Sequence, residues 1–335
     1  MYNLFINMKA LIQTFLKIIL PLFFGVLLLW YLYKEIDFIE LMNVIKSGVR
    51  YDILFLSLLF GLFANIVRGF RWGLLIRSIG EKVSYTNTIL AVLGNYAVNL
   101  LLPRVGEIWR CGIIKKYDKI SFPKLLGTLL IDRVSDTVMV SSATVLIFFF
   151  NTDFFINFFS KNPSFLQTIE KFLTSAWIYV ILISLIAVVY LIFKYLGELM
   201  LVRKTKEMLL KIFEGIKSIA VMERKWLFII QTFLIWIGYF FFFYTTFYAF
   251  EFTTDLGINV GLVTFIMSSI AVAAPVQGAI GPWHFMVIAT LVCYKVDATD
   301  AAAFALVVHT VQTVWTGLCG VLGIVMLPIM NKKTN

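Results

Sequence analysis

The sequence predicts an all-α polytopic membrane protein, with six full spans, two re-entrant helix pairs and an inverted repeat of two halves. Three observations predict this fold class: the composition, the lengths of the uncharged runs and the distribution of Lys and Arg. Of 335 residues, 61% are hydrophobic and only 14% are charged, and the mean hydropathy is +0.91. This composition excludes a soluble fold built around one buried core.

Six runs are long enough, or nearly long enough, to cross a hydrocarbon core about 30 Å thick. They are residues 18–33, 53–67, 125–150, 174–193, 226–250 and 301–331. The run 125–150 carries three charges, and the others are uncharged. We expect each of the six to form a membrane-spanning helix.

Two further apolar stretches, residues 83–103 and 256–275, are interrupted by proline and glycine. Proline lacks a backbone donor and breaks a helix interior, and glycine permits the sharp turn that follows. The predicted tips of two re-entrant helix pairs are Pro103, Gly106, Pro275, Gly278 and Gly281.

The positions of Lys and Arg favour the re-entrant interpretation. If every apolar stretch crossed the membrane, 9 Lys and Arg would lie inside and 19 outside, with Arg133 left out because it lies within the bilayer. If both broken stretches enter and return, 22 lie inside and 6 outside, as the positive-inside rule requires. This topology predicts a bacterial inner-membrane protein with both termini cytoplasmic and a basic, amphipathic cytoplasmic segment at residues 194–225.

The same topology divides one domain, residues 1–335, into oppositely oriented halves at about 1–155 and 156–335. A weak sequence echo agrees, because residues 131–138 can be aligned with residues 307–314 and each half has a Pro-x-x-Gly at its break. Inverted repeats with broken helices are typical of transporters. A membrane enzyme or scaffold that shares the symmetry is the alternative.

Asp132, Arg133 and Asp136 lie about two turns inside an otherwise apolar helix. Each charge there costs roughly 2.5 to 3.5 kcal/mol on insertion scales, so these residues need partners. Arg133 and Asp136 are spaced to pair on one helical face, and Asp132 can reach a cation on another helix. Two interpretations are open: an ion-pair clasp near the headgroup level, or a polar lining for a headgroup path.

Arginines near the first break are candidates for phosphate binding, because a guanidinium fork matches phosphate oxygens. Arg104, Glu107 and Arg110 follow one another at i,i+3 spacing, which predicts two guanidiniums around one carboxylate on one helical face. Arg68 and Arg71 at the end of the second span are either substrate-binding residues or arginines that snorkel to the interface beside a belt residue, Trp72.

Several function classes are excluded or disfavoured. The net charge of +10 fits basic loops against anionic lipid better than nucleic acid. Cys111, Cys293 and Cys319 have no metal or disulfide spacing and are expected to be packing residues. No HExxH, GxSxG or paired nucleophile and base is present, so we expect no enzyme activity, no metal and no cofactor.

Four motifs in this order and spacing resemble the flippase-like integral membrane family, the transmembrane region of lysylphosphatidylglycerol synthases and its stand-alone relatives. They are Arg68-Gly-Phe-Arg-Trp72, Pro103-Arg-Val-Gly-Glu-x-x-Arg110, Asp132-Arg-Val-Ser-Asp136 and Pro275-Val-Gln-Gly-Ala-Ile-Gly281. The resemblance covers nearly the whole chain. It implies a protein that moves, or helps to move, lipids with charged headgroups. The separate domain that makes the aminoacylated lipid in synthases is missing, so synthesis is not implied.

The first functional hypothesis is therefore a translocator of anionic or lipid-linked headgroups, in which Arg104 and Arg110 hold phosphate. The second is an accessory membrane subunit, with no transport of its own, for a lipid- or polymer-assembling system. The expected partners are membrane lipids, and a homo-oligomer is compatible with either hypothesis.

The only two histidines, His284 and His309, depart from the family pattern. The resemblance implies glutamate at the first position and arginine at the second. Because the return helix and the last span are antiparallel and joined by a short loop, the two rings are predicted to approach each other. A histidine pair can share a proton without burying two full charges. Alternatively, each ring bonds a backbone carbonyl separately.

Overall fold

A computed structural model describes residues 26–34, 36, 38–102, 104–161, 222–274 and 276–332, with isolated positions at 23 and between 163 and 195. Most of the predicted span at 174–193 and nearly all of the amphipathic segment at 194–225 lie outside the described residues, as do Pro103 and Pro275. The first predicted span, 18–33, is helical over its described part, residues 26–33. The described residues are otherwise helical, apart from turns and one isolated bridge between Val49 and Phe250.

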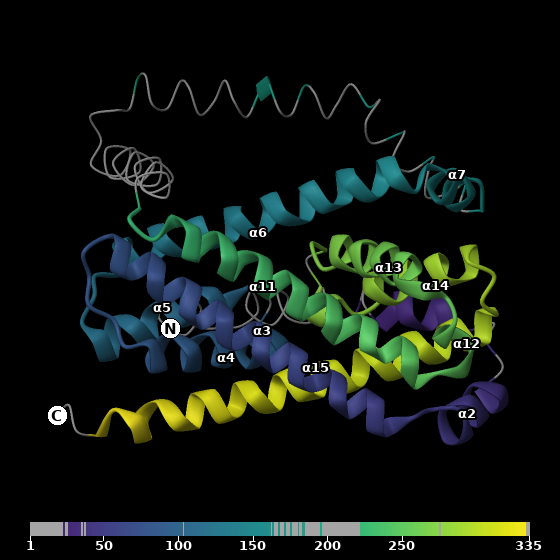
Figure 1. Cartoon of the computed structure of the whole chain (residues 1–335), viewed down its shortest axis with the longest axis horizontal. Coiled ribbons are helices and arrows are strands. Elements are labelled where there is room, and N and C mark those ends of the chain that lie inside the picture. The colour runs from purple at the N-terminus through teal and green to yellow at the C-terminus, as the bar shows by residue number, and fades with distance from the viewer. Residues whose placement is uncertain are drawn as a thin grey trace, which may run out of the picture.

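Four described helices are long and apolar enough to cross a membrane. They are α3 (Tyr51–Ser78), α6 (Phe122–Phe150), α11 (Lys225–Tyr244, continued by the 3-10 helix η1 at Thr245–Ala249) and α15 (Ala298–Met330). They match four of the six predicted spans. All four extend along the long axis of the molecule (Figure 1). The chain is therefore a multi-pass membrane protein.

Two pairs of shorter helices replace the two broken apolar stretches. The first pair is α4 (Tyr85–Leu101) with α5 (Val105–Asp118), and the second is α13 (Gly257–Ala271) with α14 (Pro282–Cys293). The first pair occupies the left half of the molecule and the second the right half (Figure 1).

The residue immediately before each return helix is left-handed. Arg104 has φ 64° before α5, and Gly281 has φ 91° before α14. Glycine adopts this conformation at little cost, whereas arginine is strained there. Both loops that follow the return helices also contain a left-handed lysine, Lys119 with φ 60° and Lys295 with φ 68°.

The two breaks contact each other. One guanidinium nitrogen of Arg104 donates to the backbone carbonyl of Ala273 at 2.8 Å, and the short 3-10 turn η2 (Gln277–Ala279) contacts α4. The Arg104 bond satisfies a carbonyl that the end of α13 would otherwise leave without a helical partner. The first break thus caps the second.

Helix α4 packs closely along α15 because glycines line the contact. A Cβ atom at Gly320 would lie 2.6 Å from the Cβ of Ala97, and one at Gly323 would lie 2.8 Å from the carbonyl oxygen of Leu90. Both distances are too short for a side chain, so the two backbones approach directly. This packing fixes α4, and with it the first break, against the last span.

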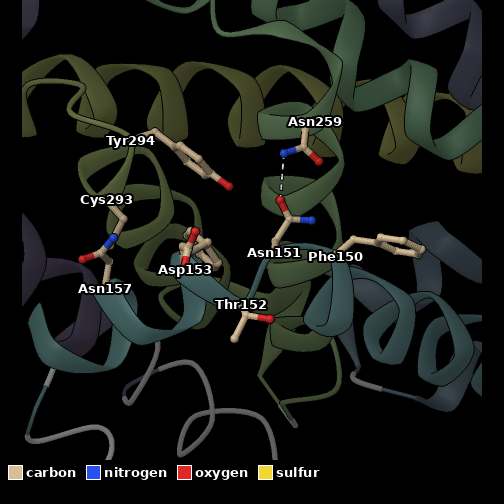
Figure 2. A pocket seen from close by; sticks show the side chains of 9 residues that line it. Phe150, Asn151, Thr152, Asp153, Asn157, Asn259, Cys293 and Tyr294 are labelled. Carbon is tan, nitrogen blue, oxygen red and sulfur yellow. Dashed lines mark hydrogen bonds between the residues drawn. The ribbon is translucent and has the colours of Figure 1, made fainter.

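A short helix, α7 (Thr152–Lys161), follows α6 after Asn151. Its Phe154, Phe155 and Phe158 are buried in the main apolar core. Aromatic residues at i, i+1 and i+4 cover one helical face, and that apolar face is stabilised by burial. Beside α7 lies a hollow of about 390 Å³ between the ends of α6, α13 and α14 (Figure 2).

Candidate functional site

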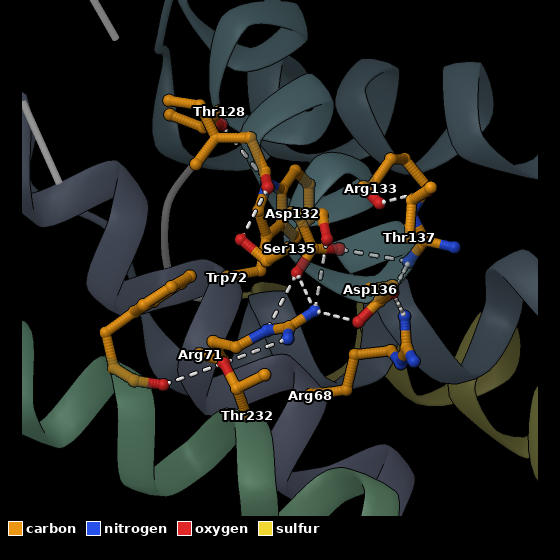
Figure 3. A network of polar contacts seen from close by, with 12 residues as sticks. Arg68, Arg71, Trp72, Thr128, Asp132, Arg133, Ser135, Asp136, Thr137 and Thr232 are labelled. Carbon is orange, nitrogen blue, oxygen red and sulfur yellow. Dashed lines mark hydrogen bonds and ion pairs between the residues drawn. The ribbon is translucent and has the colours of Figure 1, made fainter. Parts of the chain in front are cut away.

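Charged residues on α3, α5 and α6 form one network, and Figure 3 shows its members on α3 and α6. Its members are Arg68, Arg71, Glu107, Arg110, Asp132, Arg133 and Asp136. Every arginine in it contacts at least one carboxylate within 3.3 Å. The network is the largest group of charges among the described residues.

Asp132 is the centre of the network and is 0% exposed. Two guanidinium nitrogens of Arg71 donate to its Oδ1 at 2.6 and 3.0 Å. Its other oxygen accepts from Arg110 at 2.9 Å and from Arg133 at 3.0 Å. Three arginines therefore compensate the carboxylate that was predicted to need a cation from a neighbouring helix, and that prediction is confirmed.

Asp136 lies one helical turn further along α6. It accepts from Arg68 at 2.5 Å and from Arg71 at 2.7 Å. Arg133 lies 3.3 Å from the same carboxylate, which confirms the predicted i,i+3 pair. Arg71 bridges the two aspartates, so α3 and α6 are held together by one buried guanidinium.

Uncharged groups on α3, α4 and α11 complete the network. Thr232 accepts from Arg71 at 3.2 Å, and the Tyr239 hydroxyl accepts from Arg68 at 3.2 Å. Tyr239 in turn donates to Asn65 at 2.7 Å and shares a hydrogen bond of 2.8 Å with Tyr96 on α4. These four residues were not predicted as members of the site. Each is a polar residue within an apolar run, and that isolation was the signal in the sequence that could have indicated them.

Arg110 is only partly satisfied. Its side chain is 1% exposed and stacks on the ring of Trp72, 4.5 Å from the ring centroid. Besides the bond to Asp132, its Nε and one terminal nitrogen have no hydrogen-bond partner within the described residues. With four arginines against three carboxylates, the network carries a formal charge of +1. It therefore has both spare donors and spare positive charge.

The predicted arrangement of Arg104, Glu107 and Arg110 on one helical face is wrong. Glu107 does not lie between the two arginines; it contacts Arg133 at 3.3 Å. Because Arg104 precedes α5 in a left-handed conformation, the i,i+3 spacing does not apply to it, and the buried Asp132 attracts Arg110 instead.

The snorkelling interpretation is also wrong. Arg68 and Arg71 are 5% and 0% exposed, and Trp72 is fully buried. Their position in α3 faces the aspartates of α6, and pairing with a buried carboxylate removes the need to reach water. Trp72 donates to Thr128 at 3.1 Å and is part of the core rather than an interfacial belt.

The two histidines are neighbours, as predicted. Their ring centroids are 4.6 Å apart, and the Trp283 ring lies 5.0 Å from that of His309. His309 Nε2 donates to the carbonyl of Gly278 at 2.8 Å, so one ring does bond a backbone carbonyl. The buried Nδ1 of His284 has no partner among the described residues.

The long apolar helices and the buried charge network define a polytopic integral membrane protein. Within that class, the chain belongs to the family described as the lysylphosphatidylglycerol synthase transmembrane region, whose model matches residues 18–320. This match confirms the resemblance seen in the four motifs. No curated protein matches the chain.

Proposed function

We propose that the chain translocates lipids with a phosphate-containing or otherwise charged headgroup across the bacterial inner membrane. The observation that carries this proposal is Arg110, a buried arginine in a network of net positive charge, two of whose nitrogens have no partner among the described residues. A buried donor without a partner costs about 1 to 3 kcal/mol. An anionic oxygen would relieve that cost.

Phosphate suits Arg110 better than another carboxylate side chain would. A guanidinium binds phosphate oxygens through charge-assisted hydrogen bonds. Nε and one terminal nitrogen of Arg110 have no partner among the described residues, while the other terminal nitrogen donates to Asp132. Trp72 covers one face of the guanidinium and fixes its plane. A headgroup could then bind while its tails stay in the bilayer.

We also propose that the two halves are an inverted repeat, which supports alternating access. Glu107 is the third residue of α5 and contacts Arg133, the twelfth of α6. His284 is the third residue of α14 and contacts His309, the twelfth of α15. Left-handed residues also occupy matching places. Arg104 and Gly281 directly precede the two return helices, and Lys119 and Lys295 lie three residues before the starts of α6 and α15.

In this proposal α4 with α5 and α13 with α14 are re-entrant pairs that enter from opposite sides, the first from the cytoplasm. Both chain termini are cytoplasmic. Irregular backbone at membrane depth is tolerated where it is buried in protein or lines a cavity. The contact between Arg104 and Ala273 then closes the path between the breaks, and it has to open when a headgroup passes.

The test uses purified protein in liposomes that carry a labelled anionic lipid in one leaflet. Arg110→Lys keeps a positive charge beside Asp132 but loses the planar guanidinium, so we expect lipid movement to slow about tenfold. Arg50→Lys, at an exposed pair with Asp52, is the matched control and keeps the original rate. If Arg110→Lys moves lipid at the original rate, Arg110 is not the headgroup contact.

An accessory role is the second candidate, and the closed part of the network favours it. Arg68, Arg71 and both aspartates are fully engaged with one another, which is what an ion-pair clasp requires. If the wild-type protein moves no anionic, zwitterionic or lipid-linked sugar probe, the accessory role replaces translocation.

A further inference from the structure

A second polar site lies at the C-terminal end of α6, away from the network near the middle of that helix. The hollow of about 390 Å³ opens where α6 passes into α7 (Figure 2). Asp132 is the eleventh residue of α6, whereas Asn151 directly follows its last residue. The residues with polar or aromatic groups in its lining include Asn151, Asp153, Phe154, Asn157, Asn259 and Tyr294.

Two amides in this hollow are arranged as a donor and an acceptor. The Asn259 side-chain nitrogen donates to Asn151 Oδ1 at 2.7 Å. This bond fixes both amide planes, and the nitrogen of Asn151 and the oxygen of Asn259 have no hydrogen-bond partner in the described part of the chain. A hydroxyl group both donates and accepts, so this pair is complementary to a hydroxyl.

Tyr294 adds an unused hydroxyl and an aromatic wall. Its hydroxyl oxygen is buried, has no hydrogen-bond partner among the described residues and points into the hollow (Figure 2). The Tyr294 ring stacks on Phe154 with centroids 5.2 Å apart and an interplanar angle of 9°. A rigid ring beside polar groups suits a ligand with an apolar face and a polar edge.

The charge of the lining selects against anions. Asp153 is the only charged residue among the described residues that line the hollow, so a phosphate would meet repulsion and no guanidinium. We propose that this hollow binds an uncharged polyhydroxyl group, such as a sugar or glycerol, carried on a lipid or free in solution. The proposal does not depend on lipid transport.

The test measures binding to the full chain in nanodiscs. The probes are free glucose, a glucosyl diacylglycerol and phosphatidic acid, which carries a phosphate without a polyhydroxyl headgroup. Tyr294→Phe keeps the ring but removes the hydroxyl, so we expect affinity for the glucosyl probe to fall about fivefold, and Asn259→Leu to cause at least that loss. Tyr248→Phe, which lies in a different hollow, is the control and keeps the original affinity.

Free glucose and the glucosyl diacylglycerol together distinguish the source of the ligand. Binding of the glycolipid alone identifies a headgroup presented by the membrane, and equal binding of free glucose identifies a soluble ligand; both support the site if Tyr294→Phe weakens them. The proposal is overturned if neither free glucose nor the glucosyl diacylglycerol binds, if both variants bind as the wild type does, or if phosphatidic acid competes equally well.

Discussion

The two halves of the molecule place different chemistry at corresponding positions. In the first half, Glu107 and Arg133 form an ion pair at 3.3 Å, whereas in the second half the rings of His284 and His309 are 4.6 Å apart. Both contacts join the third residue of a return helix to the twelfth residue of the following long helix.

The surroundings explain the difference. Asp132 and Asp136 are the eleventh and fifteenth residues of α6, and the corresponding residues of α15 are Val308 and Gln312. The aspartates give a guanidinium at position 133 compensation on its own helix. Val308 is apolar, and Gln312 donates to the carbonyl of Phe242. Histidine makes a polar contact there without the cost of an uncompensated buried charge.

The largest effect is expected when the carboxylate of Asp132 is removed, because the eleventh residue of α15 is the apolar Val308. Asp132→Ala leaves Arg71 and Arg110 buried without their main partner, and breaking such a buried pair costs about 3 to 5 kcal/mol. We expect a large fall in the thermal unfolding temperature of the protein in detergent.

Asp52→Asn is the control for this change, because Asp52 pairs with Arg50 at the exposed start of α3. It should leave the unfolding temperature as it is. Equal stability of the Asp132→Ala variant and the wild type would show that the network is not a stabilising centre, and the comparison of the halves would lose its basis.

A swap of chemistry in the second half sharpens the comparison. His284→Glu alone buries a carboxylate beside Trp283 and His309, and His309→Arg alone buries a guanidinium. The double variant pairs them, so we expect the two changes together to cost less than their sum, by about 1 to 3 kcal/mol. Thermal unfolding of the four proteins measures this coupling.

The control cycle combines His309→Arg with Thr137→Glu, an exposed position on α6, and should be additive. Additive behaviour of the histidine cycle as well would mean that positions 284 and 309 do not form one unit.

The smallest effect is expected at the matching contact in the first half. Glu107 and Arg133 are 28% and 35% exposed, and Arg133 keeps its bonds to both aspartates when Glu107 is changed. Glu107→Gln should therefore cost about 1 kcal/mol or less, as measured by thermal unfolding. A loss as large as that of Asp132→Ala would show that the first half depends on this contact and not on the aspartates.

The sequence by itself determined the features that depend on local composition. Apolar length identified the spans of α3, α6, α11 and α15, and Pro-Gly punctuation located both breaks, because the bilayer imposes these rules on each segment separately. Helical spacing also predicted the Arg133 and Asp136 pair, and a short loop between antiparallel helices predicted that the histidines would meet.

Tertiary structure determined which charged side chains form pairs. Arg68 and Arg71 are more than 60 residues from the aspartates that they contact, and Tyr239 reaches the network from α11. No spacing rule connects such positions, since the pairing depends on how α3, α6 and α11 are rotated and how closely they approach one another in the folded chain. For the same reason Arg110 pairs with Asp132 and not with the predicted Glu107, because a buried carboxylate attracts a guanidinium more strongly.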